Sequence, residues 1–122
     1  MLNTNADVKH IIAGDFNFEC RPGNVGYDLF AQIAADYGLV CCDSKVKSTN
    51  VLYTYNHETL RQQSWLDHFF VSKELHSSIY DVKIIDSGCN LSDHLPISCA
   101  IKINVSDSTP NNNIMGNNRI YR

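Results

Sequence analysis

Apolar positions along the chain form several short runs and one stripe with helical spacing. Residues 8–14 are an apolar run that stops at Gly-Asp-Phe-Asn, which predicts a buried strand. A helix is expected next, between an N-cap at Asn24 or Gly26 and a terminating glycine at Gly38. Asp28 would lie in the first turn of this helix, where a carboxylate suits the helix dipole. The apolar face of the predicted helix consists of Phe30, Ile33, Ala34 and Tyr37.

The remaining apolar segments are short and typical of strands. They cover residues 39–42, 51–55, 66–72 and 82–85, and a last strand in which Ile97, Cys99, Ile101 and Ile103 alternate with other residues. Strands that alternate with a helix predict an α/β domain, which we place at residues 1–105. Residues 106–122 are polar, Asn-rich and aperiodic, and this pattern predicts a disordered tail.

Composition and charge narrow the class of protein. Of the 122 residues 43% are hydrophobic, which suits a folded chain, and the net charge is −3. A free-standing nucleic-acid binder usually carries a basic patch, and this charge gives no sign of one. No apolar run approaches the ~18 residues of a membrane span. The first residues lack the apolar stretch of a signal peptide, so we expect a nuclear or cytoplasmic protein with no membrane partner.

The cysteines predict no metal site by their spacing. The chain has five, at positions 20, 41, 42, 89 and 99, and none forms a Cys-x-x-Cys pair. Zinc-binding sequences usually place their ligands closer together than this. Without secretion a disulfide framework is not expected either. The sequence therefore predicts reduced thiols that pack mostly in the core.

Polar side chains follow or precede three of the predicted strands. Asp15 and Asn17 follow the first strand, and in extended geometry residues two apart point the same way. Asp67 opens another strand, and Asp93 and His94 lie just before the last one. Gathered at one edge of a sheet, these side chains would form a metal-assisted phosphoryl-transfer site. We expect Asp67 rather than Asp93 to hold His94, because neighbours along a strand point to opposite faces.

Each of these residues also has an ordinary structural interpretation. Asp15 and Asn17 are common turn formers, and Asp67 could be a strand-end acid that satisfies nearby backbone groups. A single histidine such as His94 is more often a surface or core residue than a catalytic one. The order and spacing of the three turns, rather than any one of them, favour a functional site.

The three turns together resemble a known family. GDFN at 14–17, SWLDHFFVS at 64–72 and SDHLPI at 92–97, in that order, are similar to the second half of the endonuclease/exonuclease/phosphatase family. This family shares the fold of deoxyribonuclease I, and the resemblance covers residues 8–104. It implies the C-terminal half of an α/β sandwich of two packed sheets. SWLDH, with Tyr-Thr-Tyr at 53–55 upstream, is similar to the endonuclease domains of non-LTR retrotransposons.

The resemblance implies a role for each matched residue. Asp15 would position the attacking water, and Asn17 would bind the scissile phosphate. Asp67 would orient His94, and His94 would contact the phosphate. Asp93 would serve the metal or the water. In the complete domain the implied cofactor is Mg²⁺ or Mn²⁺, and the implied partner is DNA.

One departure from the family implies a truncated domain. Family members carry an Asn and a metal-binding Glu in their first half, and only thirteen residues precede Gly14 here. We therefore expect weak or no metal binding and little or no activity alone, with apolar residues from Ile11, Phe69 or the strand at 97–103 unusually exposed. That face would pair with a missing N-terminal half or with a second copy. The alternatives are a non-catalytic remnant or partner-binding half-domain and, less favoured, the inositol-phosphate or sphingolipid branches of the family.

Overall fold

The computed structural model describes residues 8–47 and 51–104. The elements are, in order, β1 (Ile11–Asp15), α1 (Val25–Asp36), β2 (Leu39–Cys41), the 3₁₀ helix η1 (Asp43–Lys45), β3 (Tyr55–His57), β4 (Gln62–Ser64), β5 (Asp67–Ser72), α2 (Lys73–His76), β6 (Ile79–Ile84) and β7 (Ile97–Ile101). The predicted tail at 106–122 lies outside the described residues.

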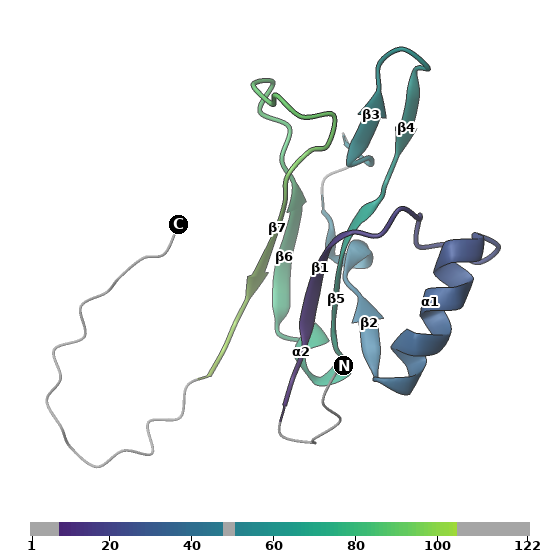
Figure 1. Cartoon of the computed structure of the whole chain (residues 1–122). Coiled ribbons are helices and arrows are strands. Elements are labelled where there is room, and N and C mark those ends of the chain that lie inside the picture. Colours follow the sequence, from purple (N-terminus) through teal and green to yellow (C-terminus); the bar gives the residue numbers. More distant parts are fainter. Residues whose placement is uncertain (1–7, 48–50, 105–122) are drawn as a thin grey trace, which may run out of the picture.

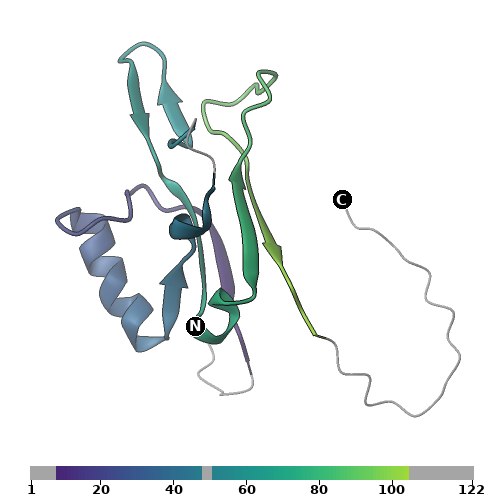
Figure 2. The ribbon, with the colours of Figure 1, turned by 180° about the vertical axis from the view of Figure 1, so that it is seen from behind.

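The elements form three layers, which Figure 1 shows side by side. The middle layer is an antiparallel sheet with the strand order β1-β5-β2. Helix α1 covers one face of this sheet, and the antiparallel pair β6-β7 packs against the other face. The β3-β4 pair continues beyond one end of the sheet, as both ribbon views show (Figures 1 and 2). The predicted α/β class with packed sheets is therefore confirmed.

The core between α1 and the sheet is built from aromatic rings. Phe70 is 2% exposed, and its ring centroid lies 4.7 Å from that of Phe30 and 5.0 Å from that of Phe16. Phe18 and Ala34 complete the buried cluster together with the start of β2. Edge-to-face ring pairs of this kind add to the stabilisation from burial alone.

Helix α1 begins and ends where the sequence predicts. The side chain of Asn24 accepts a hydrogen bond from the backbone N–H of Tyr27 at 3.2 Å and so caps the first turn. Gly38 follows the helix with φ 61°, a left-handed conformation that glycine adopts at little cost. Ile33 departs from the prediction, because it belongs to the expected apolar stripe and is nevertheless 49% exposed.

The second core lies between β5 and the β6-β7 pair. Val71 and Cys42 are fully buried there, against Ile79 and Val82 of β6. Phe69, a further apolar residue of β5 on this face, is half-buried and packs against the same cluster. The expectation that Phe69 would be unusually exposed is therefore wrong.

The first strand is less buried than its apolar sequence predicts. It covers Ile11–Asp15, and Ile11 is 51% exposed. The reason is that β1 is an edge strand, with β5 on one side and no further strand of the described residues on the other. Ile103, just beyond β7, is 67% exposed. The expected exposure is confirmed at these two positions and not along β7, where Cys99 and Ile101 are half-buried against the second core. No helix among the described residues is long and apolar enough to span a membrane.

Candidate active site

The pairing of β1 with β5 brings two carboxylates together. Asp15, the last residue of β1, is the register partner of Asp67, the first residue of β5. Side chains at paired positions lie on the same face, and like charges directly opposite each other are destabilising. This face is the one that carries β6-β7. The sheet therefore holds two acids at a position where a cationic group would stabilise them.

The turn after β1 fixes the carboxylate of Asp15. Its Oδ1 accepts a hydrogen bond from the backbone N–H of Asn17 at 2.9 Å, and Phe16 donates its N–H to the carbonyl of Leu66 at 2.9 Å. Asn17 has φ 54°, a left-handed conformation that Asn tolerates better than most residues. The expectation of extended geometry at Asn17 is therefore wrong, because the backbone turns at this residue to bond the Asp15 side chain.

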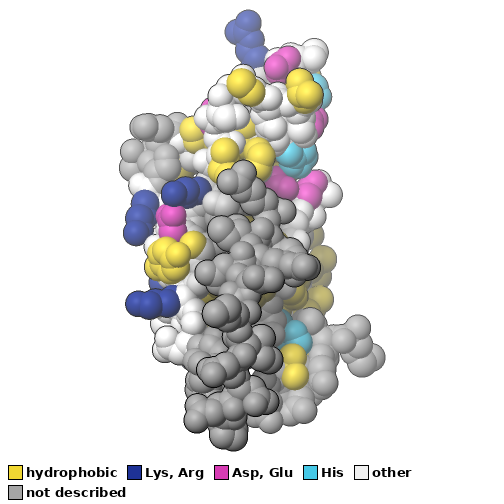
Figure 3. Space-filling model, turned by 90° about the vertical axis from the view of Figure 1, so that its left-hand side faces the viewer, with side chains coloured by type: hydrophobic (Ala, Val, Ile, Leu, Met, Phe, Trp, Pro, Cys, Tyr) yellow, Lys and Arg dark blue, Asp and Glu magenta, His cyan; other side chains and the backbone are white. Residues whose placement is uncertain are grey.

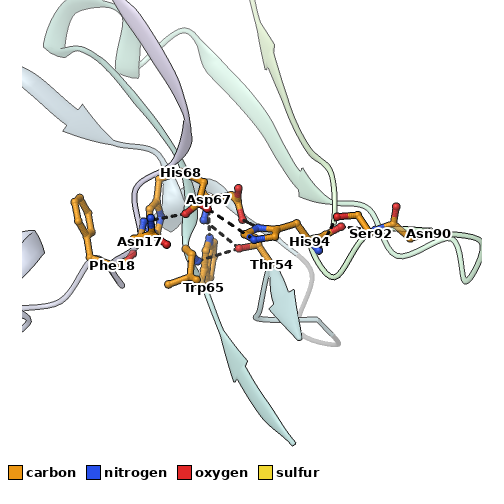
Figure 4. A network of polar contacts seen from close by, with 11 residues as sticks. Asn17, Phe18, Thr54, Trp65, Asp67, His68, Asn90, Ser92 and His94 are labelled. Atoms are coloured by element: carbon orange, nitrogen blue, oxygen red, sulfur yellow. Dashed lines mark hydrogen bonds and ion pairs between the residues drawn. The ribbon is translucent and has the colours of Figure 1, made fainter. Parts of the chain in front are cut away.

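The loop before β7 is held against β3 by backbone hydrogen bonds. Leu95 donates its N–H to the carbonyl of Thr54 at 2.7 Å, and Asn56 donates to the carbonyl of Asp93 at 2.9 Å. The His94 N–H donates to the Ser92 hydroxyl at 3.1 Å. These bonds on both sides of His94 place its ring above the start of β5 (Figure 4).

His94 lies between the two carboxylates. Its Nδ1 is 2.8 Å from Oδ2 of Asp67, and its Nε2 is 3.7 Å from Oδ2 of Asp15. The expected proximity of Asp67 and His94 is confirmed, and Asp15 joins them. The hydrogen bond with Asp67 raises the pKa of His94 above its usual value, burial opposes this, and the charges of Asp67, Asp15 and Asp93 add to the rise. Because a carboxylate accepts, Nδ1 carries a proton and Nε2 is the nitrogen that faces outward.

Thr54 supports the site in a way that the sequence analysis misses. It is fully buried, and its hydroxyl oxygen accepts hydrogen bonds from the N–H groups of Leu66 and Asp67 at 2.9 and 3.0 Å. With its carbonyl bonded to Leu95, this one residue joins the start of β5 to the loop of His94. The Tyr-Thr-Tyr pattern at 53–55 marks the segment in the sequence, but nothing local indicates that its threonine is buried.

Two clefts lie beside the three residues. One of about 540 Å³ is lined by Tyr55, Asp93 and other residues of β3 and the loop before β7. The other, of about 420 Å³, is lined by Asn17 and residues of β4. Among the described residues, Asp15, Asp67 and His94 line neither cleft. The two outer members of the predicted site, Asn17 and Asp93, thus lie in different clefts.

The donor atoms of the site suit a hard cation. Carboxylate oxygens of Asp15 and Asp67 and a ring nitrogen of His94 lie within 4.8 Å of one another. Oδ1 of Asp67 takes no part in the bond to His94, and Oδ2 of Asp15 lies 3.7 Å from His94, beyond hydrogen-bond length. Asp93 is exposed and does not belong to this group of ligand atoms. Oxygen donors of this kind are what Mg²⁺ prefers.

The surface around the site is acidic. Figure 3 shows acidic and histidine side chains near one another in the upper right part of the face it presents, whereas basic side chains lie beside acidic ones at the top and at the left. Three carboxylates act on one imidazole, so the formal charge with His94 protonated is −3 + 1 = −2. A phosphate group would be repelled by this charge unless a cation accompanied it.

This chain is similar to solved structures, whereas no protein-family model and no curated protein matches it. An endonuclease/exonuclease/phosphatase family protein from Leptotrichia buccalis C-1013-b has a TM-score of 0.58 and 22% identity, over 81% of this chain and 37% of that one. The 3′ phosphatase NExo from Neisseria, bound to product DNA hairpin, has a TM-score of 0.61 and 20% identity, over 78% of this chain and 46% of the other.

This chain therefore spans less than half the length of either protein. At these identities the likeness concerns the fold. The resemblance that the three turns indicate is confirmed at that level: the chain has the α/β fold of part of an endonuclease/exonuclease/phosphatase domain.

Proposed function

We propose that this chain is part of a domain that hydrolyses phosphate esters of DNA, and that its activity is of the retrotransposon endonuclease type. One observation carries the proposal: His94 is hydrogen-bonded to Asp67 on one side and faces Asp15 on the other. A nucleic-acid substrate is supported by the DNA hairpin bound to the similar Neisseria phosphatase. The retrotransposon type rests on the sequence pattern SWLDH alone.

The three residues supply complementary chemistry. Asp67 keeps His94 protonated at Nδ1 and raises its pKa, so His94 can present a donating Nε2–H to a phosphate oxygen. Asp15 lies 3.7 Å from that nitrogen, so its carboxylate can orient a water molecule or take its proton. Asn17 would bind the phosphate from the neighbouring cleft through its amide.

The charge of the site supports a divalent cation as cofactor. Carboxylate oxygens of Asp15 and Asp67 would hold it. Asp93, on the loop of His94 and outside this group of ligand atoms, would serve the metal through a bound water. A bound Mg²⁺ or Mn²⁺ would neutralise charge that builds up on the phosphate oxygens. Two carboxylates alone bind Mg²⁺ weakly, so we expect low affinity in this chain without further ligands.

We also propose that residues 8–104 act together with another part of a domain. The coverage of the two similar structures, 37% and 46% of their lengths, supports this. Ile11 and Ile103, at 51% and 67% exposure, offer apolar surface that such a part or a second copy would cover. A non-catalytic remnant would share this exposure, and only activity distinguishes the two.

A nicking assay tests the proposal. Supercoiled plasmid and a 3′-phosphorylated oligonucleotide are incubated with the chain alone, and with the N-terminal part of a family member added, in Mg²⁺ or in EDTA. We expect little activity alone and Mg²⁺-dependent activity from the mixture. His94→Ala should lower that rate by about 10²- to 10⁴-fold, because a positioned acid or base contributes this much.

His76→Ala is the matched control, because His76 is also half-buried and lies in α2, after the far end of β5, where it lines neither cleft. Plasmid nicking supports the endonuclease, whereas release of phosphate alone supports a 3′ phosphatase like the Neisseria protein. A mixture that is inactive, or as active with His94→Ala as without it, would refute the proposed chemistry.

A further inference from the structure

The opposite face of β5 carries a second group of polar side chains. His68 follows Asp67 directly and, because strand residues alternate, points to the α1 side of the sheet. Cys20, Cys41 and Asp43 meet it there, and one ligand atom from each of the four residues lies within 4.8 Å of the others. They come from four separate segments: the turn after β1, the end of β2, the start of η1 and β5. The side chain of His68 thus lies on the opposite face of β5 from the side chain of Asp67.

The bonds of His68 fix which nitrogen faces the cluster. Its Nε2 is 2.6 Å from the carbonyl oxygen of Phe18, which can only accept, so Nε2 carries a proton. Its Nδ1 is 2.9 Å from Oδ2 of Asp43, which also accepts. If His68 were neutral, its unprotonated Nδ1 and Oδ2 of Asp43 would be two acceptors facing each other, and they would repel. A proton or a cation must therefore lie between Nδ1 and Oδ2. Metal-binding histidines commonly donate their other N–H to a carbonyl in this way.

The ring of His68 is held rigidly. It is stacked on Phe18 at 5.7 Å and 19°, and on Trp65 at 6.4 Å and 15°. The residue is 1% exposed. Its Nδ1 therefore points at the cluster in one fixed direction, as the ligand of a preformed site does. Cys20, Cys41 and Asp43 are only half-buried, which leaves a route for an ion from the surface.

The distances suit a tetrahedral zinc ion after a small expansion. Zn–S bonds of about 2.3 Å in a tetrahedron put two sulfurs about 3.8 Å apart, and Zn–N and Zn–O bonds of about 2.0 Å put those atoms about 3.3 Å apart. The Sγ atoms of Cys20 and Cys41 are 3.4 Å apart, and Nδ1 of His68 is 2.9 Å from Asp43. Each pair needs to open by roughly half an ångström, well within side-chain movement.

We propose that Cys20, Cys41, Asp43 and His68 form a structural zinc site. Two thiolates, an imidazole and a carboxylate are ligands that Zn²⁺ accepts, and four protein ligands leave no position for a substrate. On binding, each thiol and Nδ1 of His68 give their protons to solvent as the sulfur or nitrogen bonds the ion, so thiol oxidation is not involved. The site ties β2, β5 and the turn after β1 together on the α1 side. Spacing along the sequence hides it, because no two cysteines of the set are close in the chain.

Cobalt and zinc binding to the whole chain, kept reduced, test the proposal. We expect one Zn²⁺ per chain by competition with a chromophoric chelator. Co²⁺ should give thiolate-to-metal absorption in the near ultraviolet and the intense visible bands of a tetrahedral ion. Cys41→Ser and Asp43→Asn should weaken zinc binding by at least tenfold. Zn²⁺ should also raise the urea midpoint of the wild type and not that of Cys41→Ser.

Two control variants separate this site from other binding. Cys99→Ser removes a half-buried thiol from the other core and should keep full zinc binding. His94→Ala should keep it as well, because His94 lies on the opposite face of β5. No binding by the reduced chain, the weak bands of octahedral Co²⁺, or binding unaffected by Cys41→Ser would overturn the proposal. In the first case His68 is a protonated partner of Asp43 and the two thiols are simply packed together.

Discussion

Replacing Thr54 by Val tests how the site is held in place. Valine has nearly the shape of threonine and lacks the hydroxyl oxygen. In this chain that oxygen accepts the N–H groups of both Leu66 and Asp67, at 2.9 and 3.0 Å, in a fully buried position. Thr54→Val therefore leaves two backbone donors without their partner at the start of β5, next to the carboxylate that holds His94.

The expected loss of stability follows from the two bonds. A buried donor left unpaired costs about 1–3 kcal/mol, so two cost about 2–6 kcal/mol. A domain of this size is stable by only about 5–15 kcal/mol, so the change should be large. Thr54→Ser keeps the oxygen and loses one methyl group, which costs about 1 kcal/mol. The polar serine should thus be less harmful than the apolar valine, the reverse of the order that burial of apolar surface predicts.

Urea unfolding of the three proteins measures these differences. Thr59→Val is the control, because Thr59 is exposed in the β3-β4 turn and should change stability by less than about 0.5 kcal/mol. Backbone amide shifts of Leu66 and Asp67 report whether the hydrogen bonds are lost. Should Thr54→Val prove as stable as the wild type, or more stable than Thr54→Ser, the assigned role of the hydroxyl is wrong.

Two further predictions concern His94 and the aromatic core. The hydrogen bond with Asp67 raises the pKa of His94 in the folded chain. The pair therefore stabilises the fold fully below the pKa of His94 in the unfolded chain, and this stabilisation is lost as the pH rises through the pKa in the folded chain. Asp67→Asn should lower the pKa of His94 in an NMR titration, and an unchanged pKa would contradict this. Phe70→Ala should lower the free energy of unfolding in urea by about 3–5 kcal/mol, because Phe70 is 2% exposed. Leu29→Ala is the control, since Leu29 is 63% exposed and its loss should lower that free energy by less than about 1 kcal/mol. Equal losses would contradict the packing described.

The sequence predicts those parts of the fold whose signals are local. The cap at Asn24, the glycine at Gly38 and the strand at 67–72 depend on residue types close together in the chain, and the structure has all three. The exposure of β1 depends instead on its place at the edge of a sheet, which an apolar run does not encode. Strand β4, Gln62–Ser64, is polar and forms by pairing with β3, so no periodicity marks it.

In the candidate site, too, some contacts follow from local sequence signals and others only from the pairing of distant segments. The Asp67–His94 pair follows from strand alternation and from the order of the three turns. The register that sets Asp15 opposite Asp67 requires the antiparallel pairing of β1 and β5. The meeting of Cys20 with Cys41 requires the turn after β1 to pass beside the end of β2. Contacts between distant segments of this kind are fixed by packing, which no single segment contains.

Strand β5 contributes one residue to each of two Asp–His pairs, and the two histidines differ in how far they are buried. On one face Asp67 of the strand holds His94 of a loop, and the histidine side chain is 30% exposed. On the other face His68 of the strand is held by Asp43 of η1, and the histidine side chain is 0% exposed. A histidine that contacts a phosphate must be reachable by it, so only the first pair can meet a substrate. The second has no path to a macromolecule, and its ring can act only through a proton or an ion enclosed beside it. One Asp-His step in the sequence thus contributes to both proposed sites, because alternation along the strand places the carboxylate of Asp67 on the face of the proposed active site and the imidazole of His68 on the face of the proposed zinc site.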